Sequence, residues 1–367
     1  MNRKHSYPIH QRVDTLGLLP PPLIGGADFS SSEIELARRT TSLLTLTYLV
    51  SGKCNLKCPY CYTDAGKALS NELTFSECKS VIDQAKDLGA KTIWIPGSGE
   101  PFLDKNFYSN GEFPLIDYAN QKGLSVTFFT NGYFVTGAIA QTLIKKNVCV
   151  ITKINSFKPQ IQDFLAGRKG VFFKLREGLR NLIEAGFNEN MPTRLGVNTV
   201  ITKQNYDEIL DIFRFCRTNN IIPYISITLH GGRANQHNDL DVSASKIKNL
   251  FHNALEIDQK LYGYTWIPSP PIMADQCRKL YYDIVVTSTG EVRFCPGIPI
   301  TIGSIRKEPL FDIMHKSELL HRIRNIKQHL KGKCGRCSND SCIYGCRLEA
   351  YSTGDLFGED PSCWRTL

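Results

Sequence analysis

The sequence lacks the features of a membrane or secreted protein. It contains no run of about 18 apolar residues, so no membrane-spanning helix is predicted. The segment Met1–Pro8 is basic but has no apolar stretch, so it does not follow the pattern of a signal peptide. Internal repeats and low-complexity tracts are also missing. We therefore expect a cytoplasmic globular protein that has no membrane partner.

Cysteine, in contrast, is abundant: the chain has 13 cysteines among 367 residues. The number is odd, and disulfide scaffolds are typical of small secreted domains rather than of a chain this long. Metal binding is the better explanation, with the thiols kept reduced.

The net charge of +9 suggests anionic partners. Candidates are an acidic peptide, a phosphorylated metabolite, a nucleic acid, or an electron donor such as flavodoxin or ferredoxin. Nucleic acid is the least favoured, because the basic stretch from Arg306 to Lys333 shows no interleaved pattern of aromatic residues.

Three cysteines, Cys54, Cys58 and Cys61, form a C-x3-C-x2-C motif directly after the strand-like run Leu44–Val50. A cubane iron–sulfur cluster needs four ligands, one for each iron. Three thiolates on one loop would leave one iron open, and an open metal position is typical of a catalytic site. The alternatives are a zinc knuckle, which needs a fourth ligand nearby, and a disulfide pair. No His or further Cys follows until Cys78, in a predicted amphipathic helix.

With the aromatic Tyr60 before its last cysteine, this motif resembles that of the radical S-adenosylmethionine (SAM) superfamily. The resemblance runs from about Leu44 to the C-terminus. It implies a [4Fe–4S] cluster whose open iron binds SAM, reductive cleavage of SAM to a 5′-deoxyadenosyl radical, and hydrogen-atom abstraction from a substrate. The protein's own task is then to position and shield the reactants.

Strand-like and helix-like segments alternate from Leu44 to about Leu229, which predicts parallel strands with right-handed crossovers. The predicted strands are Leu44–Val50, Thr92–Ile95, Ser125–Phe129, Val148–Ile151, Leu195–Ile201 and Tyr224–Leu229. The predicted helices are Phe75–Leu88, Phe113–Gln121, Ala138–Lys145, Val171–Ala185 and Tyr206–Arg217. This pattern matches the partial (β/α)6 barrel of the resembled family, an α/β fold. We expect an irregular lead-in over 1–42, the barrel over 43–235, a linking helix within 236–264 and a small cysteine-rich iron–sulfur domain over 265–367.

The resemblance also implies SAM contacts. Ser98-Gly99-Glu100-Pro101 follows the second strand where the family has Gly-Gly-Glu-Pro, a run that accepts a hydrogen bond from the SAM amino group. Further contacts are expected at Thr130, Asn131, Ser156, Arg194 and Asn198. An arginine could hold the SAM carboxylate with two hydrogen bonds. The alternative for each of these residues is ordinary loop polarity. Lys153 and His230, at predicted strand ends, are either substrate contacts or loop residues.

The last hundred residues carry seven more cysteines in the pattern C-x12-G-x4-C, C-x2-C-x4-C-x3-C and a final C. They are Cys277, Cys295, Cys334, Cys337, Cys342, Cys346 and Cys363. This pattern resembles the SPASM extension of radical SAM enzymes, which carries two auxiliary [4Fe–4S] clusters. One spacing is C-x4-C where five residues are usual. The alternative is a zinc ribbon, which would use four of the seven cysteines.

Two cubanes need eight thiolates and only seven are present. By motif position, the outer cluster takes Cys334, Cys337, Cys342 and Cys363. The inner cluster takes Cys277, Cys295 and Cys346. Its fourth iron is then open, or is bound by a side chain such as Asp275 or Gln276. Cys78, Cys149 and Cys216 are expected to be packing residues.

The favoured function is oxidative modification of a peptide or protein, such as a thioether or carbon–carbon crosslink. The second hypothesis is radical dehydrogenation, epimerisation or rearrangement of a sugar, nucleoside or cofactor precursor. It is supported by the lead-in, which is too short for the separate peptide-binding domain of one subgroup. An electron-transfer or scaffold protein is the third hypothesis, against which the predicted SAM contacts argue.

Overall fold

The computed structural model describes residues 17–339 and 342–365. Within these ranges the strands form one sheet in the order β6-β5-β4-β3-β2-β1-β7-β8-β9. The strands are β1 (Thr45–Tyr48), β2 (Thr92–Ile95), β3 (Ser125–Thr130), β4 (Val148–Lys153), β5 (Leu195–Ile201), β6 (Ile222–Ile227), β7 (Asp283–Val286), β8 (Glu291–Arg293) and β9 (Gly303–Ser304). Strands β1 to β6 are parallel to their neighbours, whereas β8 and β9 are antiparallel. The predicted partial α/β barrel is confirmed.

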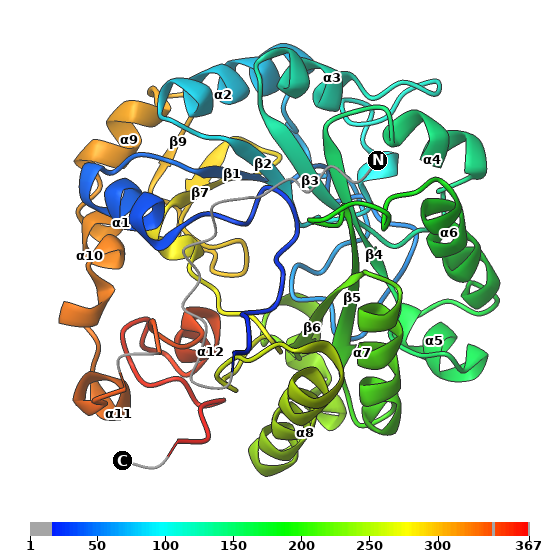
Figure 1. Cartoon of the computed structure of the whole chain (residues 1–367). Coiled ribbons are helices and arrows are strands. Elements are labelled where there is room, and N and C mark those ends of the chain that lie inside the picture. The colour runs from blue at the N-terminus through cyan, green and yellow to red at the C-terminus, as the bar shows by residue number, and fades with distance from the viewer. Residues whose placement is uncertain (1–16, 340–341, 366–367) are drawn as a thin grey trace.

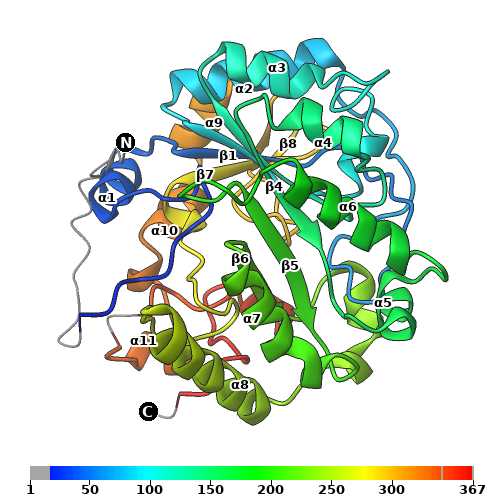
Figure 2. The same ribbon diagram turned by 45° about the vertical axis from the view of Figure 1, so that its right-hand side comes forward.

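Helices cover the outer surface of this curved sheet (Figures 1 and 2). Those of the barrel are α2 (Phe75–Asp87), α3 (Pro114–Gln121), α4 (Gly137–Leu143), α5 (Pro159–Ala166), α6 (Phe172–Glu184), α7 (Ile209–Thr218) and α8 (Ala244–Ile257). The others are α1 (Ser31–Thr40) in the lead-in, and α9 (Leu310–Lys316), α10 (Glu318–Arg324), α11 (Gly332–Arg336) and α12 (Arg347–Ser352) near the C-terminus. None of the helices in the described ranges has the length and apolar character needed to cross a bilayer.

Strands β1, β2 and β4 are buried on both faces, as expected for a parallel sheet under helices. In β4, Val150 packs into the large core beneath the helices. Its neighbour Ile151 points the other way and joins a small cluster with Trp94 inside the barrel. Ile24 of the lead-in belongs to the same cluster, so the lead-in closes one end of the barrel.

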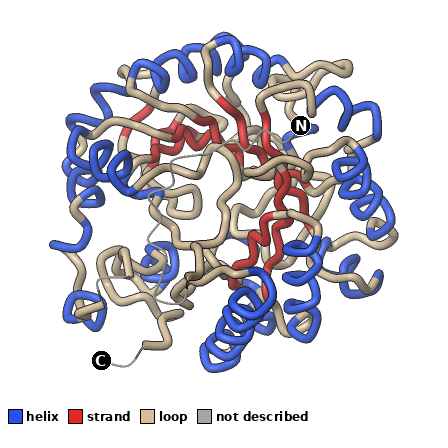
Figure 3. Tube along the Cα trace, viewed as in Figure 1, coloured by secondary structure: helices blue, strands red, loops and turns tan. Residues whose placement is uncertain are grey.

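The cysteine-rich region shares the sheet of the barrel. Its strand β7 pairs in parallel with β1, in register from Thr45 opposite Asp283 to Tyr48 opposite Val286. The large core likewise includes both Leu46 of β1 and Leu310 of α9. The sheet forms an arc (Figure 3), and the C-terminal segment with α12 lies across its open side in Figure 1. The C-terminal region thus completes the wall that the partial barrel leaves open.

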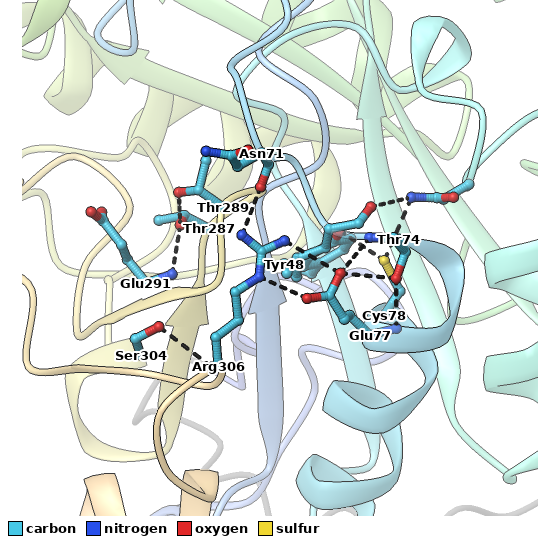
Figure 4. Close-up of polar contacts among 12 residues, drawn as sticks. Tyr48, Asn71, Thr74, Glu77, Cys78, Thr287, Thr289, Glu291, Ser304 and Arg306 are labelled. Carbon is cyan, nitrogen blue, oxygen red and sulfur yellow. Dashed lines mark hydrogen bonds and ion pairs between the residues drawn. The ribbon is translucent and has the colours of Figure 1, made fainter.

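Arg306, just after β9, ties this region to α2 (Figure 4). Thr74 caps α2 in a capping box with Glu77. Arg306 donates to Glu77 Oε1 at 2.7 Å and to the carbonyl of Asn71 at 2.9 Å. This guanidinium, together with the capping hydrogen bonds, lowers the pKa of Glu77 to about 2. The ion pair therefore adds to the shared core in joining the two regions.

Three details differ from the sequence-based expectation. Helix α5 was not predicted. It begins with Pro159, and proline is tolerated at the first helical position because the backbone N–H there would have no partner within the helix. The sixth strand was expected two residues later. It starts at Ile222 and includes Pro223, which an edge strand tolerates. No helix bounds were predicted for the basic stretch from Arg306 to Lys333, which contains α9 and α10.

Candidate active site

The cysteine loop lies at the C-terminal end of β1, where barrel folds place their chemistry. Cys54, Cys58 and Cys61 are all partly buried and line one inner cavity of about 320 Å³. Burial raises the pKa of Cys54 to about 12. In the folded chain this thiol is therefore protonated at neutral pH, and a metal centre that binds it must displace the proton.

Two glycines let neighbouring segments approach this loop. A Cβ on Gly99, after β2, would lie 2.2 Å from the carbonyl oxygen of Lys53. A Cβ on Gly167, the C-cap of α5 at φ +63°, would lie 2.1 Å from that of Lys57. Both distances are far below any normal contact. Only glycine at these positions allows the cysteine loop to be held from two sides.

Glu100 is almost fully buried next to this loop and organises the end of β3. Its carboxylate accepts hydrogen bonds from Thr130 Oγ1 at 2.7 Å and from the backbone N–H of Asn131 at 2.8 Å. Burial raises its pKa to about 7, against the effect of these hydrogen bonds. The structure thus brings together three residues that sequence reasoning placed around SAM, and each of them lines the inner cavity.

A second polar group lies across the cavity on β4 and β5. Lys153 Nζ donates to Asn198 Oδ1 at 2.5 Å and lies 4.7 Å from the centre of the Tyr60 ring. Burial lowers the pKa of Lys153 to about 8. Asn198 donates in turn to the carbonyl of Tyr224. Lys153 therefore faces the cavity rather than solvent, which favours the substrate-contact interpretation over that of a loop residue.

Two predicted SAM contacts, Arg194 and Ser156, do not line the inner cavity. Arg194 precedes β5, at the end away from the cysteine loop, and donates to the carbonyls of Val148, Ile144 and Lys146 at 2.8, 3.0 and 2.5 Å. The sequence showed that Arg194 flanks a strand but not at which end the site lies.

Ser156 does not line the cavity. It is buried, and its hydroxyl donates to Glu208 Oε1 at 2.8 Å. Pro101 also lies outside the lining, at the start of a short 3-10 helix, whereas Ser98 and Gly99 belong to it. The neighbour Asn155 donates to the hydroxyl of Tyr60 at 2.6 Å and so positions the aromatic residue of the cysteine motif.

The C-terminal cysteines separate into the two predicted groups. Cys277, Cys295 and Cys346 line the same inner cavity as the cysteine loop of the barrel. The other four do not line it. Burial raises the pKa of Cys342, and the nearby thiols of Cys363, Cys334 and Cys337 add to that effect. The grouping agrees with the predicted inner and outer ligand sets, which remain predictions.

Asp275, one of the two side chains suggested for the fourth inner iron, does not line the inner cavity. Its carboxylate accepts from the backbone N–H of Gln276 at 2.7 Å and lines a separate small cavity beside Ile24. Within the described ranges, no three ligating side chains converge closely enough to hold a single metal ion.

A much larger outer cavity of about 1300 Å³ opens above the inner one. It lies between the barrel mouth and the C-terminal region, and it shares Tyr62, Ser98, Gly297 and Leu348 with the inner cavity. The two spaces therefore adjoin along this shared wall.

His230, after β6, is part of the outer wall. Its ring nitrogens lie 2.7 Å from Glu349 Oε2 in α12 and 2.9 Å from Asp241 Oδ2. These two carboxylates raise its pKa to about 10. Through its contact with Glu349, His230 thus links the barrel to the C-terminal region.

Sequence reasoning missed two cations on the inner cavity, Lys279 and Arg347. Lys279 Nζ lies 4.1 Å from the centre of the Trp94 ring and 3.5 Å from Asp283 Oδ2. The sequence did offer a signal for both residues, because Lys279 lies two positions after Cys277 and Arg347 directly follows Cys346.

Comparison with known proteins agrees with this geometry. Residues 48–216 match the radical SAM superfamily model, and residues 277–338 match the SPASM iron–sulfur cluster-binding domain. The chain is 26% identical over 347 residues to the AdoMet-dependent heme synthase of Methanosarcina barkeri, covering 87% of this chain and 95% of that protein. It is also 26% identical over 345 residues to the mycofactocin maturase MftC of Mycolicibacterium smegmatis, covering 90% and 84%.

Among solved structures, Streptococcus suis SuiB bound to S-adenosylmethionine superposes with a TM-score of 0.68 at 18% identity, covering 91% of this chain and 81% of SuiB. At that identity the likeness supports the fold. The two family matches and the shared cavity together identify the enzyme class. This chain is a radical SAM enzyme with a SPASM domain, and it uses SAM and iron–sulfur clusters as cofactors.

Proposed function

We propose that this enzyme oxidatively modifies a peptide or protein, forming a thioether or carbon–carbon crosslink. In this proposal Cys54, Cys58 and Cys61 hold the cluster that binds SAM. That cluster, when reduced, supplies the electron that cleaves SAM. The seven C-terminal cysteines hold two auxiliary clusters, with Cys277, Cys295 and Cys346 on the inner one.

The chain's own residues position and shield the reactants. Glu100, with Thr130 and Asn131, presents acceptors to the amino end of SAM, while Asn198 and Lys153 offer polar groups on the opposite wall. The rings of Trp94 and Phe129 are among the apolar groups that line the inner cavity. Such a lining excludes water from a reactive radical.

The observation that carries the peptide proposal is the pair of adjoining cavities. The inner cavity, of about 320 Å³, lies between the two sets of cysteines, whereas the outer one is about four times as large, at about 1300 Å³. A substrate can therefore lie in the outer cavity and extend one side chain into the inner one. The relative MftC is named a maturase, and SuiB has been crystallised with a precursor peptide. Both descriptions support a peptide substrate here.

The test uses the reconstituted enzyme with SAM and reductant. Synthetic peptides covering short reading frames next to the gene are incubated with it and analysed by mass spectrometry. A crosslink removes two hydrogens, so we expect one peptide to lose about 2 Da, with formation of 5′-deoxyadenosine. Peptides of unchanged mass, together with conversion of a non-peptide compound, would contradict the proposal.

A second candidate is a cofactor precursor of the tetrapyrrole class. It is supported by the heme-synthase relative, which the alignment covers over 95% of its length. The outer cavity is large enough for either substrate. Iron coproporphyrin in the same assay separates the two candidates, since a mass change in it but in no peptide would favour the tetrapyrrole.

We also propose an acidic flavodoxin or ferredoxin as the electron donor, because the chain has a net charge of +9. Reduction rates that fall steeply with added salt would support electrostatic docking of such a donor. Rates that do not depend on salt would contradict it.

A further inference from the structure

Arg347 is a buried cation with two unused hydrogen-bond donors. It is the first residue of α12, directly after Cys346, and is only 3% exposed. Its Nη1 donates to the carbonyl of Gly358 at 2.7 Å and to that of Leu356 at 3.3 Å. Its Nε and Nη2 atoms are buried and have no hydrogen-bond partner within the described ranges. Buried donors of this kind rarely stay unpaired in a folded protein.

The charge of Arg347 is only partly compensated: the buried carboxylate of Asp360 is close enough to interact with it electrostatically but does not pair with it directly. Arg347 forms no ion pair with any carboxylate in the part of the chain that the structure describes, within a limit of 4.0 Å. The carboxylate of Asp360 is nearby, but it accepts from the backbone N–H of Cys346 at 2.6 Å and from Ser362 Oγ at 2.6 Å.

The buried Arg217 shows the usual solution, with two hydrogen bonds to Asp258 at 2.8 and 2.9 Å. A buried guanidinium without such a partner is strongly unfavourable, because it has lost its hydration without gaining a counter-charge. Arg347 therefore has donors and positive charge available for a further anion.

The place of Arg347 indicates which anion this is. Arg347 lines the inner cavity together with Cys277, Cys295 and Cys346. An iron–sulfur cluster with thiolate ligands is an anion whose sulfur atoms accept hydrogen bonds. We propose that Arg347 donates Nε–H and Nη2–H to the auxiliary cluster held by these three cysteines and thereby raises its reduction potential. This inference rests on the proposed ligand set.

The physical reason for the raised potential is electrostatic. Reduction adds one negative charge to the cluster, and a fixed cation nearby in a medium of low dielectric constant favours the more negative state. Hydrogen bonds to the sulfurs act in the same direction. Arg347 thus makes the inner cluster a better electron acceptor. Because Nη1 also holds the Leu356–Gly358 loop that leads to Cys363, Arg347 links the segments carrying both auxiliary clusters.

The test is a redox titration of the full-length protein, reconstituted with iron and sulfide and followed by electron paramagnetic resonance (EPR). The variant is Arg347→Met. The matched control is Arg324→Met, since Arg324 is 1% exposed and also has Nε and Nη2 without partners, but does not line the inner cavity. We expect Arg347→Met to lower the midpoint potential of the inner cluster by at least about 59 mV for one electron. At the wild-type midpoint, the ratio of reduced to oxidised inner cluster would then fall at least tenfold. The other two clusters, and all three in Arg324→Met, keep their potentials.

Unchanged potentials in Arg347→Met at full iron content would overturn the inference, and so would an equal shift in Arg324→Met. If Arg347→Met does not load its clusters, the wild-type chain decides. With ¹⁵N-labelled arginine side chains, pulsed EPR of the reduced auxiliary cluster should show a ¹⁵N coupling, and its absence would refute the contact. Wild-type protein that binds only about four irons would instead refute the proposed auxiliary clusters themselves.

Discussion

Adding a single methyl group at Gly99 should disable the enzyme. In Gly99→Ala the new Cβ would lie 2.2 Å from the carbonyl oxygen of Lys53 and 2.7 Å from that of Ser51. An ordinary contact begins at 3.4 Å, so one of the two backbones must move by roughly 1 Å. The Lys53 carbonyl also accepts the N–H of Glu100 at 2.9 Å, and Cys54 is the next residue. The movement therefore displaces the cysteine loop and the Glu100 loop relative to each other.

Overpacking of this kind costs about 1–3 kcal/mol of stability. A misplacement of about 1 Å in a reacting geometry can cost about 100-fold in rate. We expect Gly99→Ala to form 5′-deoxyadenosine about 100-fold more slowly than the wild type, measured by chromatography under anaerobic reduction.

The control is Gly66→Ala, which lies close to the same cysteines but whose Cβ would meet nothing within 4 Å. It should keep its rate within about twofold, since it adds no overlap. Equal rates for Gly99→Ala, Gly66→Ala and wild type, with equal melting temperatures, would refute the proposed packing of the loop.

Two further predictions concern protonation. The buried Glu100 has a pKa of about 7, and only its ionised form can accept from the SAM amino group. SAM affinity measured by calorimetry should therefore increase up to about tenfold for each unit by which the pH is raised towards 7, and stay constant above it. In Glu100→Gln the affinity should be weaker and independent of pH, and equal slopes in the two proteins would contradict this role. For His230, the folded pKa of about 10 lies above the ordinary 6.5, so its contacts stabilise the fold fully below pH 6.5 and lose their effect as the pH rises towards 10. The difference in melting temperature between wild type and His230→Gln should therefore be largest near pH 6 and vanish near pH 10, and a difference that grows with pH would disprove the linkage.

Much of this fold could be predicted from the sequence because strands and cluster motifs have local signals. The strand Leu195–Ile201 was predicted with the observed boundaries, because its Val, Thr and Ile residues favour a strand. The capping box of Thr74 and Glu77 likewise marked the start of α2. The pairing of β7 with β1 was not predictable in this way, because it joins residues more than 200 positions apart.

The same distinction applies to the site. The cysteines were found because their spacing is a local pattern, and Glu100 was found through the neighbouring glycines. Arg194 was misplaced because a polar residue beside a strand does not reveal which end of the barrel it occupies. Arg347 was missed because its buried, unpaired state depends on Gly358 and on the cavity, which only the folded chain shows.

The most direct test of the central claim is the yield of 5′-deoxyadenosine from the Cys54→Ala/Cys58→Ala/Cys61→Ala variant after anaerobic reduction with SAM. The account predicts none above background, while the variant retains about eight of the roughly twelve irons expected for the wild type. Formation of 5′-deoxyadenosine at the wild-type rate would contradict the assignment of these three cysteines to the SAM-cleaving cluster.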